Sequence, residues 1–492
     1  MAARGLLYHI RNYASAGVLS AFAGLISFPI FTRSLSVEQY GILGLTMASL
    51  TLFVAMGKLG MQHAVIRFYS QIKAGNISFS LNQMHSSVFA SFLFLAIVTT
   101  VIWLIMGYFV LPRFLQYENI SSLFLVASGL VFVRVLMSAV NNFLRADQQS
   151  GVVGIALVMG RYAMVALVLV ALLFTSLNPV KIFICFLLAD ILIFGFMVLK
   201  YPLAMVFKGS DFSISLVKNM AVYAVPLMVV ESLGLVLRLS DRYLIEAYLG
   251  VEELGQYSAS YNLVSYLDVI ILLSLMQAVK PLYMQLWETK GSAETSQFLS
   301  SALHKYLVLG IPFITVFCLT SPHLLNVLAS PKYAPGTVVI PFIALSYFVE
   351  GTAHFLGAGL YVAKNTRAVM FWGLLTVGVN LVLNIIFIPQ YGIVGAAAVT
   401  IASLFVFVIG TGWHAFRYVS FPVRIREPLL VALIGAAAYF LVNSIDLGAE
   451  VSDFFVKGLL SAAVLLPAVL LIDREVRLWL KQQFALFRDR YI

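Results

Sequence analysis

Long apolar runs, one after another, constrain this chain more than any other feature of its sequence. A bilayer-spanning helix needs about 20 mostly apolar residues, and fourteen such runs follow one another between short polar breaks. Because they lack the alternation of a transmembrane barrel, they predict helices, which satisfy their own backbone polar groups in lipid. We therefore expect an all-α polytopic membrane protein with about 14 transmembrane helices. The runs cover approximately residues 13–31, 41–66, 84–111, 122–143, 152–174, 182–199, 220–240, 254–279, 303–320, 337–363, 369–388, 393–413, 429–445 and 454–472.

Composition and charge agree with this class. The chain is 61% hydrophobic and only 11% charged, whereas soluble globular proteins carry about a quarter charged residues. A net charge of +10 can indicate a nucleic-acid-binding protein, but here the basic residues flank the apolar runs instead of forming one patch. We therefore expect no nucleic-acid partner.

The distribution of lysine and arginine predicts orientation, because these residues resist translocation next to a span. Loops on the side of the N-terminus carry most of them, and loops on the other side carry only Arg33, Arg113, Lys181, Arg242 and Lys332. Both termini are therefore predicted to be cytoplasmic. No small-x-small cleavage site follows the first run, which reads as a retained helix and not as a signal peptide.

Two sequence segments recur about half a chain apart. LSVEQYGILG, from Leu35, resembles LGVEELGQYS, from Leu249, and FLRADQQSG, from Phe143, resembles LYVAKNTRA, from Leu360. Both matches link runs six apart, which predicts a parallel repeat around an axis along the membrane normal, with a substrate cavity between the repeats and alternating access. We expect six-helix lobes over residues 1–202 and 203–415, with two added helices and a tail over 416–492.

The tail after Asp473 is predicted to be an amphipathic helix. Val476, Leu480, Phe484 and Phe487 share one helical stripe, with basic residues beside it. This pattern suits a helix in the headgroup layer, and a solvated helix is the alternative.

Four cations within the runs are candidates for binding a substrate headgroup. A charge near the bilayer centre costs about 2.5–3.5 kcal/mol, so it calls for a partner, a cavity or a function. Arg134 and Arg161 lie mid-run, and a guanidinium binds diphosphate oxygens through bidentate, charge-assisted hydrogen bonds. Lys58 and Arg238 lie nearer the ends of their runs. The alternatives are a structural pair with Asp190 for the first two, snorkelling for Lys58 and an interfacial ion-pair cluster for Arg238.

Carboxyls within the runs are candidates for ion coupling. They are Asp190, Glu231, Asp268 and Glu350, and His354 lies one helical turn from Glu350. A carboxyl in such surroundings can take up and release protons, as coupling to protons or sodium requires. For Glu231, Asp268 and Glu350 the alternative is pairing with Arg238, or with one another through a shared proton.

Motifs for enzymatic chemistry are absent from the sequence. It contains no Walker A segment, HExxH, CxxC or nucleophile elbow. Cys185 and Cys318 both fall inside apolar runs, which implies neither a disulfide framework nor a thiolate metal site. We expect no cofactor, no metal and no enzymatic activity.

Two segments carry a resemblance to a known family. RSLSVEQYGILGLTMASLTLFVAMGKLGMQHAVIRFY, residues 33–69, resembles the opening signature of Wzx-type bacterial polysaccharide flippases, and NLVLNIIFIPQYGIVGAAAVT, residues 380–400, resembles their C-terminal-half signature. These proteins belong to the multidrug/oligosaccharidyl-lipid/polysaccharide (MOP) exporter superfamily. The resemblance covers essentially the whole chain.

The resemblance implies a function in the synthesis of a surface polysaccharide such as O-antigen or exopolysaccharide. The substrate would be an undecaprenyl-diphosphate-linked oligosaccharide, moved from the cytoplasmic to the periplasmic leaflet of the bacterial inner membrane. Membrane lipids and a polysaccharide polymerase with its chain-length machinery would be further partners.

Two other functions remain open. A multidrug cation antiporter of the same superfamily would use the buried carboxyls, but that branch usually lacks the last two helices, and the intramembrane cations disfavour cationic drugs. A polysaccharide polymerase or ligase usually carries a large periplasmic loop, whereas the breaks on that side are short here.

Overall fold

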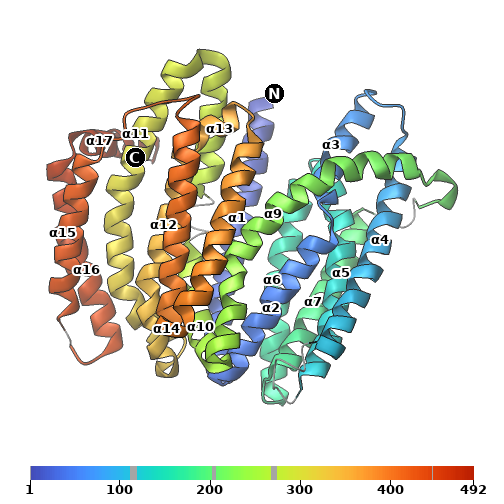
Figure 1. Cartoon of the computed structure of the whole chain (residues 1–492), viewed down its shortest axis with the longest axis horizontal. Coiled ribbons are helices and arrows are strands. Elements are labelled where there is room, and N and C mark those ends of the chain that lie inside the picture. Colours follow the sequence, from blue (N-terminus) through green and yellow to red (C-terminus); the bar gives the residue numbers. More distant parts are fainter. Residues whose placement is uncertain (1, 111–118, 202–206, 268–273, 446, 492) are drawn as a thin grey trace. The chain divides into compact units, whose positions relative to one another are not determined.

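The computed structural model describes residues 2–110, 119–201, 207–267, 274–445 and 447–491. Side chains of residues 2–11, 13–14, 110, 226, 230, 267, 274–278 and 483–491 lie outside that description. The described chain is helical almost throughout and contains no strand (Figure 1), so the predicted all-α class is confirmed.

Long helices make up the architecture of both halves of the chain. Those of the first half are α1 (Ala2–Ser34), α2 (Val37–Gly57), α3 (Met61–Lys73), α4 (Leu81–Ile105), α5 (Ile120–Ala146), α6 (Ser150–Phe174), α7 (Pro179–Lys200) and α9 (Ile214–Leu249). Those of the second half are α10 (Val251–Leu267), α11 (Ser274–Leu328), α12 (Ile340–Leu356), α13 (Ala358–Val362), α14 (Thr366–Ala415), α15 (Arg426–Asn443), α16 (Glu450–Ile472) and α17 (Arg474–Tyr491).

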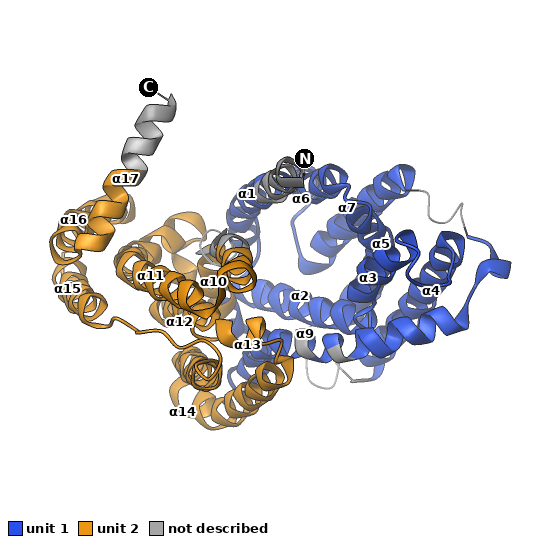
Figure 2. Cartoon of the chain, turned by 90° about the horizontal axis from the view of Figure 1, so that it is seen from above, with its two compact units in different colours: residues 1–255 blue, residues 256–492 orange. Residues whose placement is uncertain are grey.

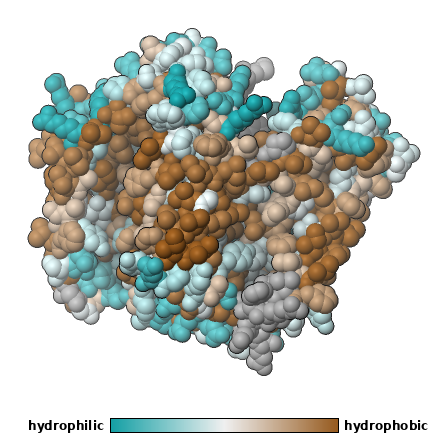
Figure 3. Space-filling model, in the orientation of Figure 1, coloured by the Kyte–Doolittle hydropathy of each residue, from teal (hydrophilic) through white to brown (hydrophobic). Residues whose placement is uncertain are grey.

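Helices that could cross a membrane agree with the predicted runs. The described residues contain 12 stretches that are long and apolar enough. One of them, α14, holds two predicted runs, because Gly392 interrupts it with φ 62° and ψ −147°. The run over 254–279 begins in α10 and crosses residues 268–273, outside the described part. On the face in Figure 3, hydrophobic residues cover the middle of the helices and hydrophilic residues gather toward their ends.

The chain divides into two compact units, residues 1–255 and 256–492 (Figure 2). Helix α9 belongs to the first unit, where it packs against α2, α3 and α4. The lobe boundaries expected after residues 202 and 415 stay predictions.

One predicted helix is in fact two. The run over residues 41–66 is broken between α2 and α3, where Leu59 and Gly60 have φ of 46° and 69°. Close packing explains the break: a Cβ on Gly60 would lie 2.3 Å from the carbonyl oxygen of Ala224 in α9. The run thus lies in one candidate span, Val37–Lys73, but that span consists of two helices, which apolarity alone does not reveal.

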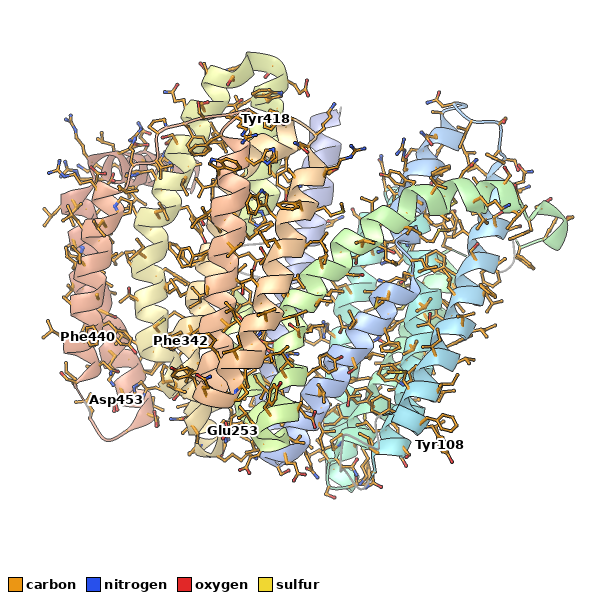
Figure 4. All side chains as sticks on the ribbon, in the orientation of Figure 1. Tyr108, Glu253, Phe342, Tyr418, Phe440 and Asp453 are labelled. Atoms are coloured by element: carbon orange, nitrogen blue, oxygen red, sulfur yellow. The ribbon has the colours of Figure 1, made fainter. Side chains whose placement is uncertain are left out.

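The recurring segments pack against each other at the starts of α2 and α10. A Cβ on Gly41 would lie 2.3 Å from the carbonyl oxygen of Val251, and one on Gly255 would lie 2.1 Å from that of Val37. Val37 and Gly41 correspond to Val251 and Gly255 in the repeat. The contact is therefore reciprocal, as two-fold related copies require. Glu253, labelled in Figure 4, shows where α10 begins.

In the second unit, polar contacts hold α16 against α11 near both ends of α16. Glu450 bonds His323 Nδ1 at 2.6 Å, and Lys457 Nζ lies 3.0 Å from His323 Nε2. Because the lysine can only donate, His323 accepts at Nε2 and donates from Nδ1. Asp453, labelled in Figure 4, lies one turn after Glu450. Beyond the other end of α16, Asp473 Oδ2 bonds His304 Nε2 at 2.5 Å.

Helix α17 is fixed by its first turn. Asp473 Oδ1 accepts the Val476 N–H at 2.7 Å, which caps the helix. Glu475 accepts hydrogen bonds from Ser301 at 2.7 Å and from Arg424 at 2.5 Å. Val476 is fully buried, while placement of the helix in the headgroup layer remains a prediction.

Candidate functional site

A cavity of about 390 Å³ lies within the first unit, between α2, α5, α6 and α7. Its volume falls in the range of small-molecule sites, roughly 300–1,000 Å³. Most of its wall is apolar, and its charged side chains come from three of the four helices. The charged residues are Arg134 and Arg145 on α5, Arg161 on α6 and Asp190 on α7.

Helix α5 presents a polar stripe to this cavity. Arg134, Ser138, Asn141 and Arg145 follow one another at spacings of four, three and four residues, and all four line the cavity. With 3.6 residues per turn, this spacing keeps them on one face. The opposite faces of α5 are apolar and buried, so the stripe cannot turn away from the cavity without exposing the core.

Arg134 and Asp190 form an ion pair in the cavity wall. Arg134 Nε donates to Asp190 Oδ2 at 2.6 Å, and the two side chains are 25% and 19% exposed. The bond uses one of the five N–H groups of the guanidinium. Arg134, predicted to bind a headgroup, and Asp190, its structural partner in the alternative interpretation, therefore both lie in this cavity wall.

Helix α6 brings Arg161 to the same cavity through close packing on α1. A Cβ on Gly154 would touch Ala16, and Asn12 Nδ2 of α1 donates to Ser150 Oγ at 3.1 Å. Gly160, the residue before Arg161, has no side chain, and a Cβ there would contact Ile193 of α7. Its absence lets α6 and α7 pack closely beside Arg161. Arg134 and Arg161, predicted from separate runs, thus line one cavity.

The charge and the walls of the cavity suit an anion with an irregular attached group. Three arginines against one aspartate leave a formal excess of two positive charges, 3 − 1 = 2. Ser138, Asn141 and Thr51 add hydrogen-bonding groups. Methionines adapt to irregular shapes, and four of them line the walls, Met47, Met137, Met164 and Met197.

Lys58 lies elsewhere, at the break between α2 and α3. It caps the C-terminal end of α2, where the helix dipole favours a cation. Just after this break, Gln62 Nε2 and His63 Nε2 lie 2.6 Å and 3.3 Å from Glu231 Oε2 of α9. Lys58 and Glu231 do not line the cavity described above.

The remaining predicted residues are also apart from the cavity. Arg238 lies on α9 of the first unit, half-buried, three residues before buried Asp241. Glu350 and His354 lie on α12 of the second unit. Asp268 lies outside the described residues.

Arg145 is the cavity residue that sequence reasoning missed. It falls in the last turn of α5, close to the end of the apolar run over 122–143, where a basic residue resembles an ordinary loop charge. The signal that could have found it is its distance of 11 residues from Arg134, three helical turns along the same face. Ser138 and Asn141 between them carry the same signal.

Comparison with known proteins identifies the family. A model described as polysaccharide biosynthesis protein matches residues 9–287, more than half of the chain, and the chain belongs to this family. It is also similar to an uncharacterized membrane protein of Methanocaldococcus jannaschii, 21% identical over 462 residues that cover 88% of each chain.

Solved structures share the fold over most of its length. The lipid II flippase MurJ in an inward closed conformation gives a TM-score of 0.74 at 15% identity, covering 96% of this chain and 99% of that one. An inward-facing multidrug resistance MATE family transporter of the MOP superfamily gives 0.64 at 12% identity, covering 82% and 95%. The chain thus shares its fold with a transporter of the MOP superfamily, as the resemblance implied, while the Wzx branch remains a prediction.

Proposed function

We propose that this protein is a flippase that moves an undecaprenyl-diphosphate-linked oligosaccharide from the cytoplasmic to the periplasmic leaflet, for synthesis of a surface polysaccharide. The observation that carries the proposal is the convergence of Arg134, Arg145 and Arg161 on one cavity among membrane-spanning helices. The polysaccharide biosynthesis family and the MOP fold support it.

Different cavity residues bind different parts of such a headgroup. The arginines bind diphosphate oxygens through charge-assisted hydrogen bonds and stay protonated in a wall of low dielectric. Ser138, Asn141 and Thr51 offer hydrogen bonds to sugar hydroxyls, and the methionine walls accept different sugar shapes. The polyprenyl tail stays in lipid, and the two lobes give access alternately to each side.

The membrane potential can drive this movement. A diphosphate head carries about two negative charges outward across an inside-negative membrane, which is worth roughly 4–5 kcal/mol per 100 mV. Coupling to an ion through Glu231, Glu350, Asp268 or Asp190 stays a prediction. Flux into vesicles with potential and pH gradient imposed separately distinguishes the two sources of energy.

A deletion in the host tests the function. We expect undecaprenyl-linked repeat units to accumulate on the cytoplasmic face, and the unaltered gene to restore export. Arg161→Ala at equal membrane level should fail to restore it. Arg67→Ala is the matched control, because Arg67 lies over the ring of Tyr223, 4.3 Å from its centroid and outside the cavity. No accumulation in the deletion strain would reject the proposal.

A multidrug antiporter is the second candidate, since MATE transporters share the fold. The excess positive charge of the cavity repels cationic drugs and so disfavours it. Drug resistance on overexpression, lost in Arg161→Ala, would reverse this ranking.

A further inference from the structure

The cavity lined by Arg134, Arg145 and Arg161 is called the arginine cavity below. Among the described residues, Asp190 is the only acidic side chain that lines it. Its Oδ2 lies 2.6 Å from Arg134 Nε, and both side chains are partly exposed. The pair therefore forms part of the cavity surface. An anion that enters the cavity meets Arg134 already bound to an anion of the protein itself.

The other charged groups that line the cavity come from two helices. Helix α5 contributes Arg134 and Arg145, and α6 contributes Arg161. Helix α2 brings Met47 and Thr51, which carry no charge. Helix α1 meets α7 through the rings of Phe31 and Phe186. One carboxylate thus shares the cavity with three guanidinium groups, of which Arg134 contacts it, and no second acid is among the described lining residues.

A bound diphosphate and an ionised Asp190 compete for Arg134. Two anions beside one guanidinium repel each other, and the repulsion is strong in surroundings of low dielectric. A proton on Asp190 removes that repulsion. The neutral carboxyl also gains an O–H donor, which can bond a phosphate oxygen.

We propose that Asp190 is a built-in competitor for the diphosphate head and that its protonation permits tight binding. In the empty cavity, the carboxylate holds Arg134. When the head binds, Arg134 turns to the diphosphate and Asp190 takes up one proton from water. When Asp190 loses the proton, it reclaims Arg134 and promotes release of the head. The inference rests on the proposed function, because it requires that the cavity bind a diphosphate.

The test uses purified full-length protein and a short-chain dialkyl diphosphate diester. This probe keeps a constant charge from weakly acidic to neutral pH, so any pH dependence belongs to the protein. Titration calorimetry in buffers of different ionisation enthalpy measures the affinity and the number of protons taken up. We expect the unaltered protein to bind the diester more tightly at acidic pH, with proton uptake.

Asp190→Asn keeps the shape and one acceptor of the side chain while removing its charge. We expect it to bind the diester about tenfold more tightly at neutral pH, with neither pH dependence nor proton uptake. Binding without proton uptake in the unaltered protein would overturn the inference, even if Asp190→Asn does not fold. So would an Asp190→Asn variant that retains the uptake.

Different results would reject the proposed function of the cavity and the proposed role of Asp190. If the diester does not bind, or if binding is the same in Arg161→Ala, the proposed function of the cavity is wrong. If binding depends on Arg161 but no proton accompanies it, the cavity keeps its function and Asp190 is a structural partner of Arg134.

Discussion

Arg145 shows how a charge at the end of a helix can belong to a site deeper in the bundle. It lies three turns from Arg134 on the face of α5 that lines the cavity. Its long side chain lets the guanidinium lie away from its own Cα. A position near the polar end of a span is therefore compatible with a role in substrate binding.

Arg145→Ala should weaken binding of the diphosphate diester about ten- to a hundredfold, because one set of charge-assisted hydrogen bonds is lost. Titration calorimetry at fixed pH and low salt measures the effect. Arg67→Ala removes the same charge outside the cavity and should leave the affinity within about twofold. Equal losses in the two variants would mean that only overall charge matters.

Glu475 makes the position of α17 sensitive to acid. Burial acts to raise the pKa of its carboxyl, but hydrogen bonds from Ser301 and Arg424 and the charges of Arg424 and Lys305 outweigh burial and hold the pKa below the ordinary value of 4.5. A carboxyl with a lowered folded-state pKa stabilises the fold above its ordinary pKa and loses this contribution as pH falls through the folded value.

We therefore expect α17 to stay with its partners through the ordinary carboxyl range and to leave them only when the pH falls below 4.5, through the lowered pKa of Glu475. Limited proteolysis over a pH series, with an acid-tolerant protease, measures this release. Glu475→Gln lacks the charge and should show increased cleavage already at neutral pH, with little further change in acid. An unaltered pH profile in that variant would show that Glu475 does not hold the helix.

At the scale of helices, Asp473 joins α11, α16 and α17. One carboxylate oxygen bonds His304 of α11, and the other caps α17. Both Asp473 and His304 are 2% exposed in their side chains. The carboxylate therefore satisfies two buried donors at the junction of three helices.

Asp473→Ala should lower the free energy of unfolding by about 3–5 kcal/mol, because it leaves His304 without its buried partner and α17 without its cap. Thermal unfolding in detergent measures the loss. Asp473→Asn can still cap α17 and should lose less. If both variants unfold at the temperature of the unaltered protein, the junction does not contribute to stability.

The sequence predicted where helices run far better than where they break. Apolar length alone located the helices, because lipid leaves the backbone no alternative. The break at Leu59 and Gly60 packs closely against Ala224, from a helix more than 160 residues later, and this contact cannot be seen in the local sequence. Gly392, three residues after Pro389, gave a local signal, and its interruption of α14 matches the gap between two predicted runs.

The cavity was predictable only in part, for the same reason. The cost of burying charge singled out Arg134, Arg161 and Asp190 one by one. Their meeting depends on which faces of α5, α6 and α7 turn inward, and small residues such as Gly154 and Gly160 decide this through packing. Lys58 carried the same cost in sequence but lies at a helix end, outside the cavity.

At the scale of the molecule, the reciprocal contact of Gly41 and Gly255 fixes the starts of α2 and α10 in the first unit. Each glycine faces a backbone carbonyl from the other copy of the repeat. A side chain at either position would force two backbones apart. Packing at this point therefore tolerates no larger residue.

Gly41→Ala and Gly255→Ala should each lower the free energy of unfolding by about 1–3 kcal/mol, because the new methyl group overlaps a carbonyl oxygen. Gly195→Ala in α7 is the control. Nothing lies within 4 Å of its Cβ position, so it should gain about 0.5–1 kcal/mol from helix propensity. Thermal unfolding compares the three, and a stabilised Gly41→Ala would refute the close contact.

A patch that meets its own copy is also how two identical chains form a two-fold dimer. Here the two copies share one chain, so each can diverge from the other. By the sequence spacing of the second match, Gly351, Gly378 and Phe407 correspond to Arg134, Arg161 and Asp190. A homodimer of half-length chains would carry this arginine cavity twice or not at all. Covalent fusion is what permits a single one.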